Sequence, residues 1–66
     1  MLDAVDRLKA AYIKKILDLQ GDDTARDFAK RLGISEPRLS NMVNGRLYGF
    51  SLEWLMRLYM SLGGEL

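Results

Sequence analysis

The chain has 66 residues, 48% of them hydrophobic and 29% charged, with a net charge of +1 and neither cysteine nor histidine. This length fits one domain, residues 1–66, and the composition excludes a disulfide framework and a zinc finger. We expect no metal, no cofactor and no enzyme activity, because the carboxylates are scattered and there is no Gly-rich phosphate loop. The apolar stretch 52–62 contains two charges and is too short to span a bilayer. We therefore expect a soluble, cytoplasmic protein with no leader peptide and no membrane partner.

The pattern is helical throughout, which predicts an all-α fold: a compact bundle of four to five helices. The first helix is expected from about Asp3 to Leu19, before a break at Gly21. Its apolar positions recur at helical spacing and form one stripe. The stripe consists of Val5, Leu8, Tyr12, Ile13, Ile16, Leu17 and Leu19.

Residues 24–44 have the pattern of two short helices joined by a tight turn. Thr24 is expected to cap the first helix with its hydroxyl, and the second helix is expected to start at Ser35. Gly33 supplies the backbone freedom for the turn, and Gly45 can adopt the left-handed conformation that ends the second helix. The residues expected to pack between the helices are Phe28, Ala29, Leu32, Ile34, Leu39, Met42 and Val43. This pattern is typical of the DNA-binding helix-turn-helix.

The last helix, about 52–62 and capped by Ser51, is apolar over most of its circumference. One face is predicted to belong to the core: Leu52, Leu55, Met56 and Tyr59. The other would lie in water on a monomer: Trp54, Leu58, Met60 and Leu62. Either the first helix covers both faces or, as we favour, two copies form a symmetric homodimer through this helix. Association of this kind would also stabilise so small a core.

Positive charge is concentrated on residues 24–50, which carry five basic and two acidic side chains. A polyanion would lie on this part of the chain. The charge alone is explained equally well by a solvated helix face, so it supports the DNA-binding interpretation without establishing it.

The stretch from Ala25 to Asn44 resembles the helix-turn-helix of the Cro/lambda-repressor-type (XRE-like) transcriptional regulators. The segment that continues from it, NGRLYGFSLEWLMRLYMSLG, is similar to a subgroup that includes small phage regulators and HigA-like antitoxins. The resemblance implies a lambda-repressor-like DNA-binding domain in a bacterial or phage-infected cell, with a recognition helix at about 35–44. The family often has glutamine where this chain has Ala25.

On this resemblance, the recognition helix enters the major groove with its outer side. Arg38 is predicted to bind guanine through two hydrogen bonds, and Asn41 to read adenine. Ser40 is a more permissive contact, Glu36 can accept from a cytosine amine, and Pro37 can only make an apolar contact. The alternatives are a phosphate contact or a pair with Glu36 for Arg38, and a solvated helix residue for Asn41.

Phosphate contacts are predicted at the margins of the motif. The start of the helix at Thr24 offers free amides and a hydroxyl, and Asn44, Arg46 and Tyr48 follow the recognition helix. Tyr48 is equally compatible with packing. Lys30 and Arg31 are expected to form simple surface or to contribute only a longer-range positive field.

Two such modules would read half-sites about one helical turn apart, so the expected partner is double-stranded DNA with an inverted-repeat operator. We expect a repressor that regulates its own operon in a phage or mobile element, with anti-CRISPR operons among the candidates. One alternative is an antitoxin that binds a toxin and its own promoter, for which a segment outside the motif would be needed. The other is a helix-turn-helix fold that serves only as a protein-docking scaffold.

Overall fold

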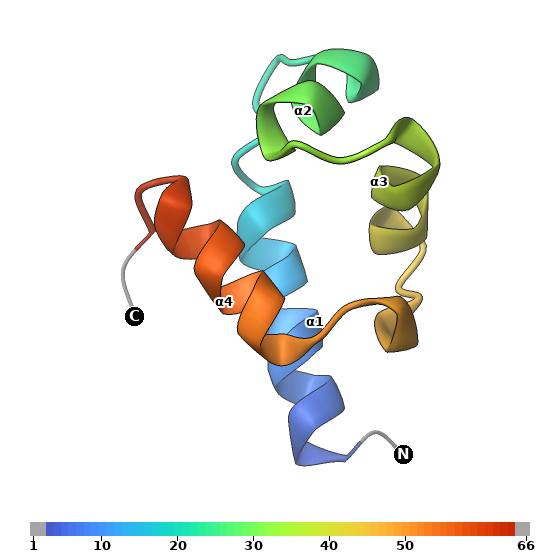
Figure 1. Cartoon of the computed structure of the whole chain (residues 1–66), viewed down its shortest axis with the longest axis vertical. Coiled ribbons are helices and arrows are strands. Elements are labelled where there is room, and N and C mark those ends of the chain that lie inside the picture. Colours follow the sequence, from blue (N-terminus) through green and yellow to red (C-terminus); the bar gives the residue numbers. More distant parts are fainter. Residues whose placement is uncertain (1–2, 65–66) are drawn as a thin grey trace.

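The computed structural model describes residues 3–64, which form four α-helices and one short 3-10 helix (Figure 1). The elements are α1 (Ala4–Leu17), α2 (Ala25–Leu32), α3 (Glu36–Val43), η1 (Leu47–Gly49) and α4 (Leu52–Ser61). No strand occurs among these residues, so the predicted all-helical fold is confirmed for them. Within the same part of the chain, no helix is long and apolar enough to cross a membrane.

Each α-helix begins at a side chain that accepts a hydrogen bond from the backbone. The Oδ1 atom of Asp3 accepts from the amide of Asp6 at 2.8 Å. The hydroxyls of Thr24, Ser35 and Ser51 accept from the amides three residues further on, at 3.1 to 3.2 Å. These amides have no acceptor inside their helix, so the caps satisfy them. The caps predicted at Thr24 and Ser51 and the helix start predicted at Ser35 are confirmed.

The turns that follow α2 and α3 are both built on a left-handed glycine. The φ angle is +74° at Gly33 and +73° at Gly45. After α2, the amide of Ile34 donates to the carbonyl of Ala29 at 3.0 Å, and the amide of Gly33 donates to that of Lys30 at 3.1 Å. This pair of bonds defines a Schellman motif, in which glycine adopts the left-handed conformation without steric cost. The predicted turn at Gly33 and the predicted helix end at Gly45 are confirmed.

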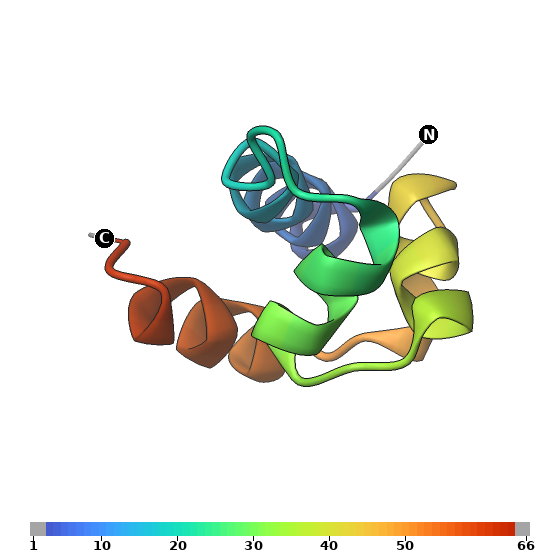
Figure 2. The ribbon, with the colours of Figure 1, turned by 90° about the horizontal axis from the view of Figure 1, so that it is seen from above.

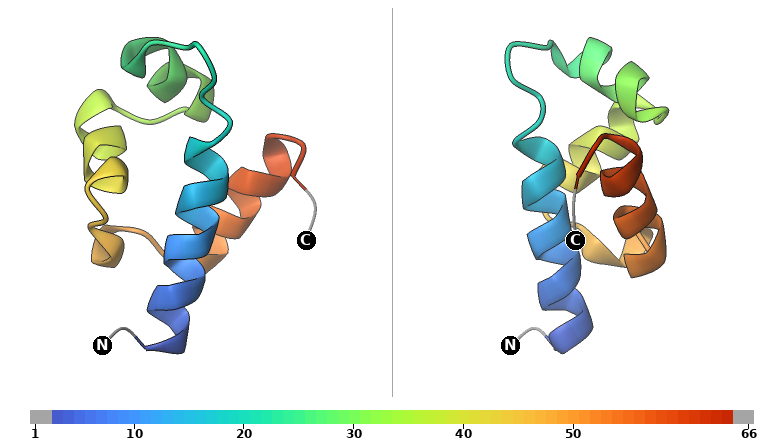
Figure 3. Two further views of the ribbon diagram at one scale, coloured as in Figure 1. Left: turned by 180° about the vertical axis from the view of Figure 1, so that it is seen from behind. Right: turned by 90° about the vertical axis from the view of Figure 1, so that its left-hand side faces the viewer.

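The helices surround one hydrophobic core. Helix α1 packs against α4 and also contacts α3 and η1, whereas α2 packs on α3 (Figures 1 and 2). The buried side chains between them are Ile13, Ile16, Phe28, Ala29, Leu32, Leu39, Met42, Phe50 and Leu55. The first turns of α1 extend past the other helices at one end of the molecule, and α2 lies at the opposite end (Figures 1 and 3).

The apolar stripe predicted for the first helix is buried only in its middle. Val5 and Leu8 are 50% and 49% exposed, because they lie on the turns of α1 that extend past the other helices. At the other end, α1 stops at Leu17, two residues earlier than predicted. The amide of Leu19 donates to the carbonyl of Ile16, three residues back, so the chain tightens there and leaves Leu19 39% exposed.

Val43 was predicted to point inward from the third helix and is instead 59% exposed. Leu39 and Met42 fill the core side of α3. Successive residues of a helix are separated by about 100° of rotation, so Val43 lies to one side of the stripe that these two define.

The predicted division of the last helix into two faces is confirmed only for Leu55 and Tyr59, which pack on the core, and for Met60, which is exposed; it is wrong for the other residues. Leu55 is fully buried, and the side chains packed on the core around it are Trp54, Leu58, Tyr59 and Leu62. Three of these were expected to lie in water on a monomer: Trp54, Leu58 and Leu62. The apolar residues on the remaining side are Leu52 and Met56, which are half-buried, and Met60, which is 51% exposed. Both divisions satisfy helical spacing, so the sequence pattern alone could not choose between them.

Candidate nucleic-acid interface

The outer side of α3 is polar and open to solvent, because Leu39 and Met42 hold the opposite side in the core. Of the five predicted base-reading residues, Glu36, Pro37 and Ser40 are exposed, and Arg38 and Asn41 are half-buried. The amide nitrogen of Asn44 donates to the hydroxyl of Ser40 at 3.3 Å, which connects two exposed residues one turn apart on this side. The polar groups of the outer side therefore begin at the start of α3 and continue to its C-cap.

Asn41 is held by the segment that follows α3. The Nη1 atom of Arg46 donates to Oδ1 of Asn41 at 2.9 Å. An arginine has no acceptor, so it must meet the oxygen of the amide, and this leaves the Nδ2 hydrogens of Asn41 as donors. Arg46 is itself exposed, and Tyr48, in η1, is 91% exposed. The structure therefore brings the predicted phosphate residue Arg46 next to the predicted base reader Asn41.

Arg38, the predicted guanine reader, lies on a different side of α3. Its Nη2 atom donates to the carbonyl of Gly49 at 3.1 Å. The guanidinium carbon lies 4.5 Å from the ring centre of Phe50 and 5.0 Å from that of Trp54. These contacts are neither of the two alternatives considered from the sequence, a phosphate contact or a pair with Glu36. The side chain is engaged with the turn after η1 and with α4.

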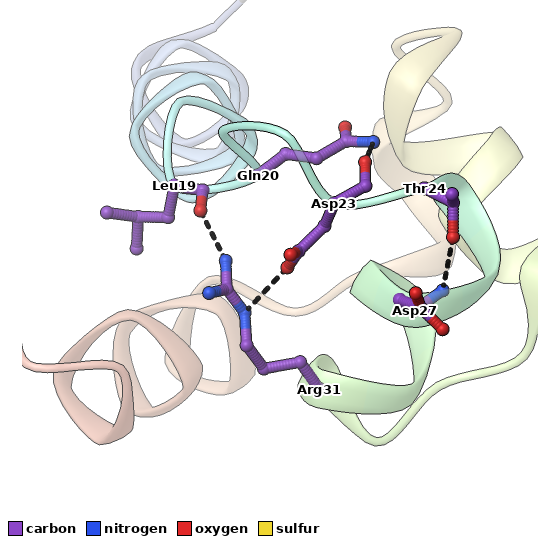
Figure 4. A network of polar contacts seen from close by, with 6 residues as sticks. All are labelled: Leu19, Gln20, Asp23, Thr24, Asp27 and Arg31. Carbon is purple, nitrogen blue, oxygen red and sulfur yellow. Dashed lines mark hydrogen bonds and ion pairs between the residues drawn. The ribbon is translucent and has the colours of Figure 1, made fainter.

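The start of α2 is positioned by contacts within the loop that precedes it (Figure 4). The Nε atom of Arg31 lies 3.5 Å from a carboxylate oxygen of Asp23, and its Nη2 donates to the carbonyl of Leu19. The side-chain amide of Gln20 donates to the carbonyl of Asp23 at 2.8 Å. Arg31 therefore connects α2 to the end of the loop after α1, and the loop leads directly into the cap at Thr24. Arg31 was expected from the sequence to be a simple surface residue, and the structure shows that it also connects two elements.

An open hollow connects the start of α2 with the outer side of α3. Its lining consists of Gln20, Ala25, Glu36, Leu39, Ser40 and Val43. Ala25 is the first residue of α2, so this helix start borders the same hollow as Glu36 and Ser40. The element predicted to bind phosphate and part of the element predicted to read bases therefore border one hollow.

The contacts made by the arginines of the motif were not predicted from the sequence. The pairs Arg46–Asn41 and Arg38–Gly49 join residues on two sides of a turn, and Arg31–Asp23 joins α2 to the loop before it. Such pairs lack the i,i+4 spacing that identifies an ion pair within one helix, as between Glu53 and Arg57. The sequence feature that could have indicated the contacts of Arg38 is a pair of aromatic residues after the motif, Phe50 and Trp54, which are separated by about one helical turn.

Comparison with known proteins places this geometry in a family. The family model described as a helix-turn-helix domain matches residues 3–66 of the chain. No curated protein and no solved structure matches the chain at a significant level.

Proposed function

The chain belongs to the helix-turn-helix domain family, and on this premise we propose that it is a sequence-specific transcriptional repressor of the Cro/lambda-repressor type. The observation that carries the proposal is the polar outer side of α3, which lies beside the start of α2 along one open hollow. In a DNA-binding helix-turn-helix, the second helix enters the major groove while the first crosses the backbone. The arrangement of α2 and α3 supports this docking mode, with α3 as the recognition helix.

Base reading is assigned to the residues on the outer side of α3. Asn41 is the principal reader, because its amide nitrogen remains a donor and its oxygen, which accepts one bond from Arg46, has a second lone pair for adenine. Ser40, Glu36 and Pro37 supply more permissive contacts, and all three are exposed. Arg38 is left out of this set because its guanidinium contacts Gly49, Phe50 and Trp54.

Phosphate binding is assigned to the two ends of the same surface. At one end are the amides that follow Thr24, where a helix start favours an anion. At the other end are Asn44, Arg46 and Tyr48, all exposed. Contacts of this kind fix the register of the protein on DNA and supply affinity without reading sequence.

We propose that the active form is a homodimer on an inverted-repeat operator. One module of this size buries little DNA surface, whereas two modules on a two-fold axis read half-sites about one helical turn apart. The surface proposed for dimerisation is the side of α4 that faces away from the core cluster: Leu52, Met56 and Met60. Of the residues assigned to the interface from the sequence, Met60 belongs to this side, whereas Trp54, Leu58 and Leu62 pack on the core.

In this proposal the protein has no catalytic activity and represses by occluding a promoter in the cytoplasm of a bacterial or phage-infected cell. The regulated promoter is its own, in an operon of a phage or mobile element, with operons that carry anti-CRISPR genes among the candidates. Family resemblance supports this biological context.

The test is a gel-shift titration at physiological salt, with the DNA upstream of the gene compared with a scrambled duplex of the same composition. We expect a shift of the upstream DNA at nanomolar protein, and a much weaker shift of the scrambled DNA that disappears with added salt. Equal, weak shifts of the two duplexes would contradict autoregulation, and the operator would then have to be sought in other DNA. No shift of either duplex would contradict the proposal and favour the antitoxin or the docking scaffold.

A further inference from the structure

The side chain of Arg38 makes one hydrogen bond and lies over two aromatic rings, and none of these contacts is explained by DNA binding. Its guanidinium lies over both Phe50 and Trp54, with ring centres at 4.5 and 5.0 Å. These two rings are themselves stacked, with centres 5.6 Å apart and planes 30° from parallel. Phe50 is 2% exposed, so the stack begins in the core and ends at the surface. We refer to these three residues as the Arg38 stack.

The Arg38 stack joins three parts of the chain at the edge of the core that they share. Arg38 belongs to α3, Phe50 directly follows η1, and Trp54 lies in the first turn of α4. The bond from Arg38 to the carbonyl of Gly49 adds a fixed backbone contact at 3.1 Å. A flat guanidinium can stack on rings and donate in its plane at the same time, and a lysine ammonium cannot.

The segment between α3 and α4 carries Arg46 and Tyr48, so its position decides where these side chains meet DNA. One end is fixed by the left-handed turn at Gly45, where the amide of Arg46 donates to the carbonyl of Asn41 at 3.0 Å. The other end is fixed by Phe50 and by the bond between Arg38 and Gly49. Between these two attachments, Leu47 packs against the core, so the bond from Arg38 is the polar contact that fixes the backbone at the Gly49 end.

We propose that Arg38 is a positioning residue, which holds the segment 46–50 and the start of α4 against the recognition helix and does not read bases. The consequence for DNA rests on the proposed function, whereas the stack itself is a property of the free protein. Arg38 acts on DNA affinity through the end of the segment that carries Tyr48, whereas Arg46 stays attached to Asn41 beside the turn at Gly45. Arg38 therefore contributes to phosphate binding, which is equal for any sequence, and leaves the base contact of Asn41 unchanged.

The decisive variant is Arg38→Lys, which keeps the charge and removes the planar group, with Arg7→Lys in the exposed part of α1 as the matched control. Binding is measured to a duplex selected from a random library, to its single base-pair variants and to a scrambled duplex. We expect Arg38→Lys to weaken binding to all of them by roughly tenfold without changing their order, and Arg7→Lys to change nothing. Loss of preference at one base pair would overturn the proposal, because it would identify Arg38 as a base reader. Unchanged affinity would overturn it as well.

A second measurement uses the unsubstituted protein and does not depend on how the variants fold. Protons of a side chain that lies over aromatic rings resonate upfield of their ordinary positions in proton NMR spectra. We expect upfield resonances for the Arg38 side chain in the free protein, and we expect them to persist when the selected duplex is added. Ordinary shifts in the free protein, or a return to them on DNA, would overturn the proposal. If no duplex bound, the proposed function would fail, while the spectrum of the free protein would still decide whether the stack exists.

Discussion

The left-handed glycine at Gly33 is the residue on which the close approach of α2 and α3 depends. Its φ angle is +74°, and a Cβ atom built there would meet nothing within 4 Å. The cost of a side chain at this position is therefore a backbone cost. We expect Gly33→Ala to lower the free energy of unfolding by about 1–2 kcal/mol, as measured by urea denaturation.

Gly49→Ala is the matched control for this prediction. A Cβ atom at Gly49 would also meet nothing within 4 Å, but its φ angle is not left-handed. The substitution adds the same methyl group without the strained backbone, so its effect should stay within about 0.5 kcal/mol. Equal losses at the two positions would contradict the assignment of the cost to backbone conformation.

The second prediction at this scale concerns Asn41, whose oxygen is occupied by Arg46 and whose nitrogen remains a donor. We expect Asn41→Ala to cost about 1–3 kcal/mol of binding to the selected duplex and to relax the preference at one base pair. Binding to single base-pair variants measures this. Lys30→Ala, an exposed residue of α2, removes a charge elsewhere on the motif and should leave base preference intact. A uniform loss for Asn41→Ala across all duplexes would assign Asn41 to phosphate binding or to the fold.

A side-chain contact could be predicted from the sequence when the two residues are close together in the chain. The caps at Thr24, Ser35 and Ser51 involve amides three residues away, so composition and order were sufficient. The partners of Arg38 lie 11 or more residues away, beyond a turn whose path the sequence did not specify. An arginine uses its guanidinium both to read a base and to stack on an aromatic ring. The direction of the side chain decides between the two roles, and the sequence does not specify that direction.

At the scale of elements, the start of α4 depends on its cap. The hydroxyl of Ser51 accepts from the amide of Trp54 at 3.1 Å. We expect Ser51→Ala to lower the free energy of unfolding by about 1 kcal/mol. Ser61→Ala is the control, because that hydroxyl donates to the carbonyl of Leu58 within the same helix and caps no free amide. If Ser61→Ala lowered the free energy of unfolding as much as Ser51→Ala, the loss at Ser51 could not be assigned to the cap.

Helix existence was easier to predict than helix orientation. The positions of all four α-helices follow from caps, glycines and apolar spacing. The face that each helix turns to the core depends on the other helices. In α4, nearly every position is apolar, so the pattern gave two acceptable faces and tertiary packing selected the one centred on Leu55 and Leu58. In α1, the apolar spacing identified the correct face of the helix. It could not show that the turns with Val5 and Leu8 extend past the core.

At the scale of the whole molecule, the exposed side of α4 determines how two copies could associate. The proposed dimer uses Leu52, Met56 and Met60, of which Met60 is 51% exposed. We expect Met60→Glu to leave a folded chain, to convert the dimer into a monomer in sedimentation analysis, and to weaken operator binding. A charge introduced at this position would be buried in the interface without a partner.

Two controls separate association from folding. Val5→Glu places the same charge at a position that is 50% exposed but lies at the far end of α1, so the dimer should persist. Leu58→Glu places it against the core, where it should abolish the cooperative thermal transition. A dimer of normal affinity in Met60→Glu would show that α4 does not form the interface. Val5 and Leu8 are themselves exposed apolar residues, in a helix that packs against α4. Loss of the dimer in Val5→Glu and not in Met60→Glu would therefore assign the interface to the first turns of α1.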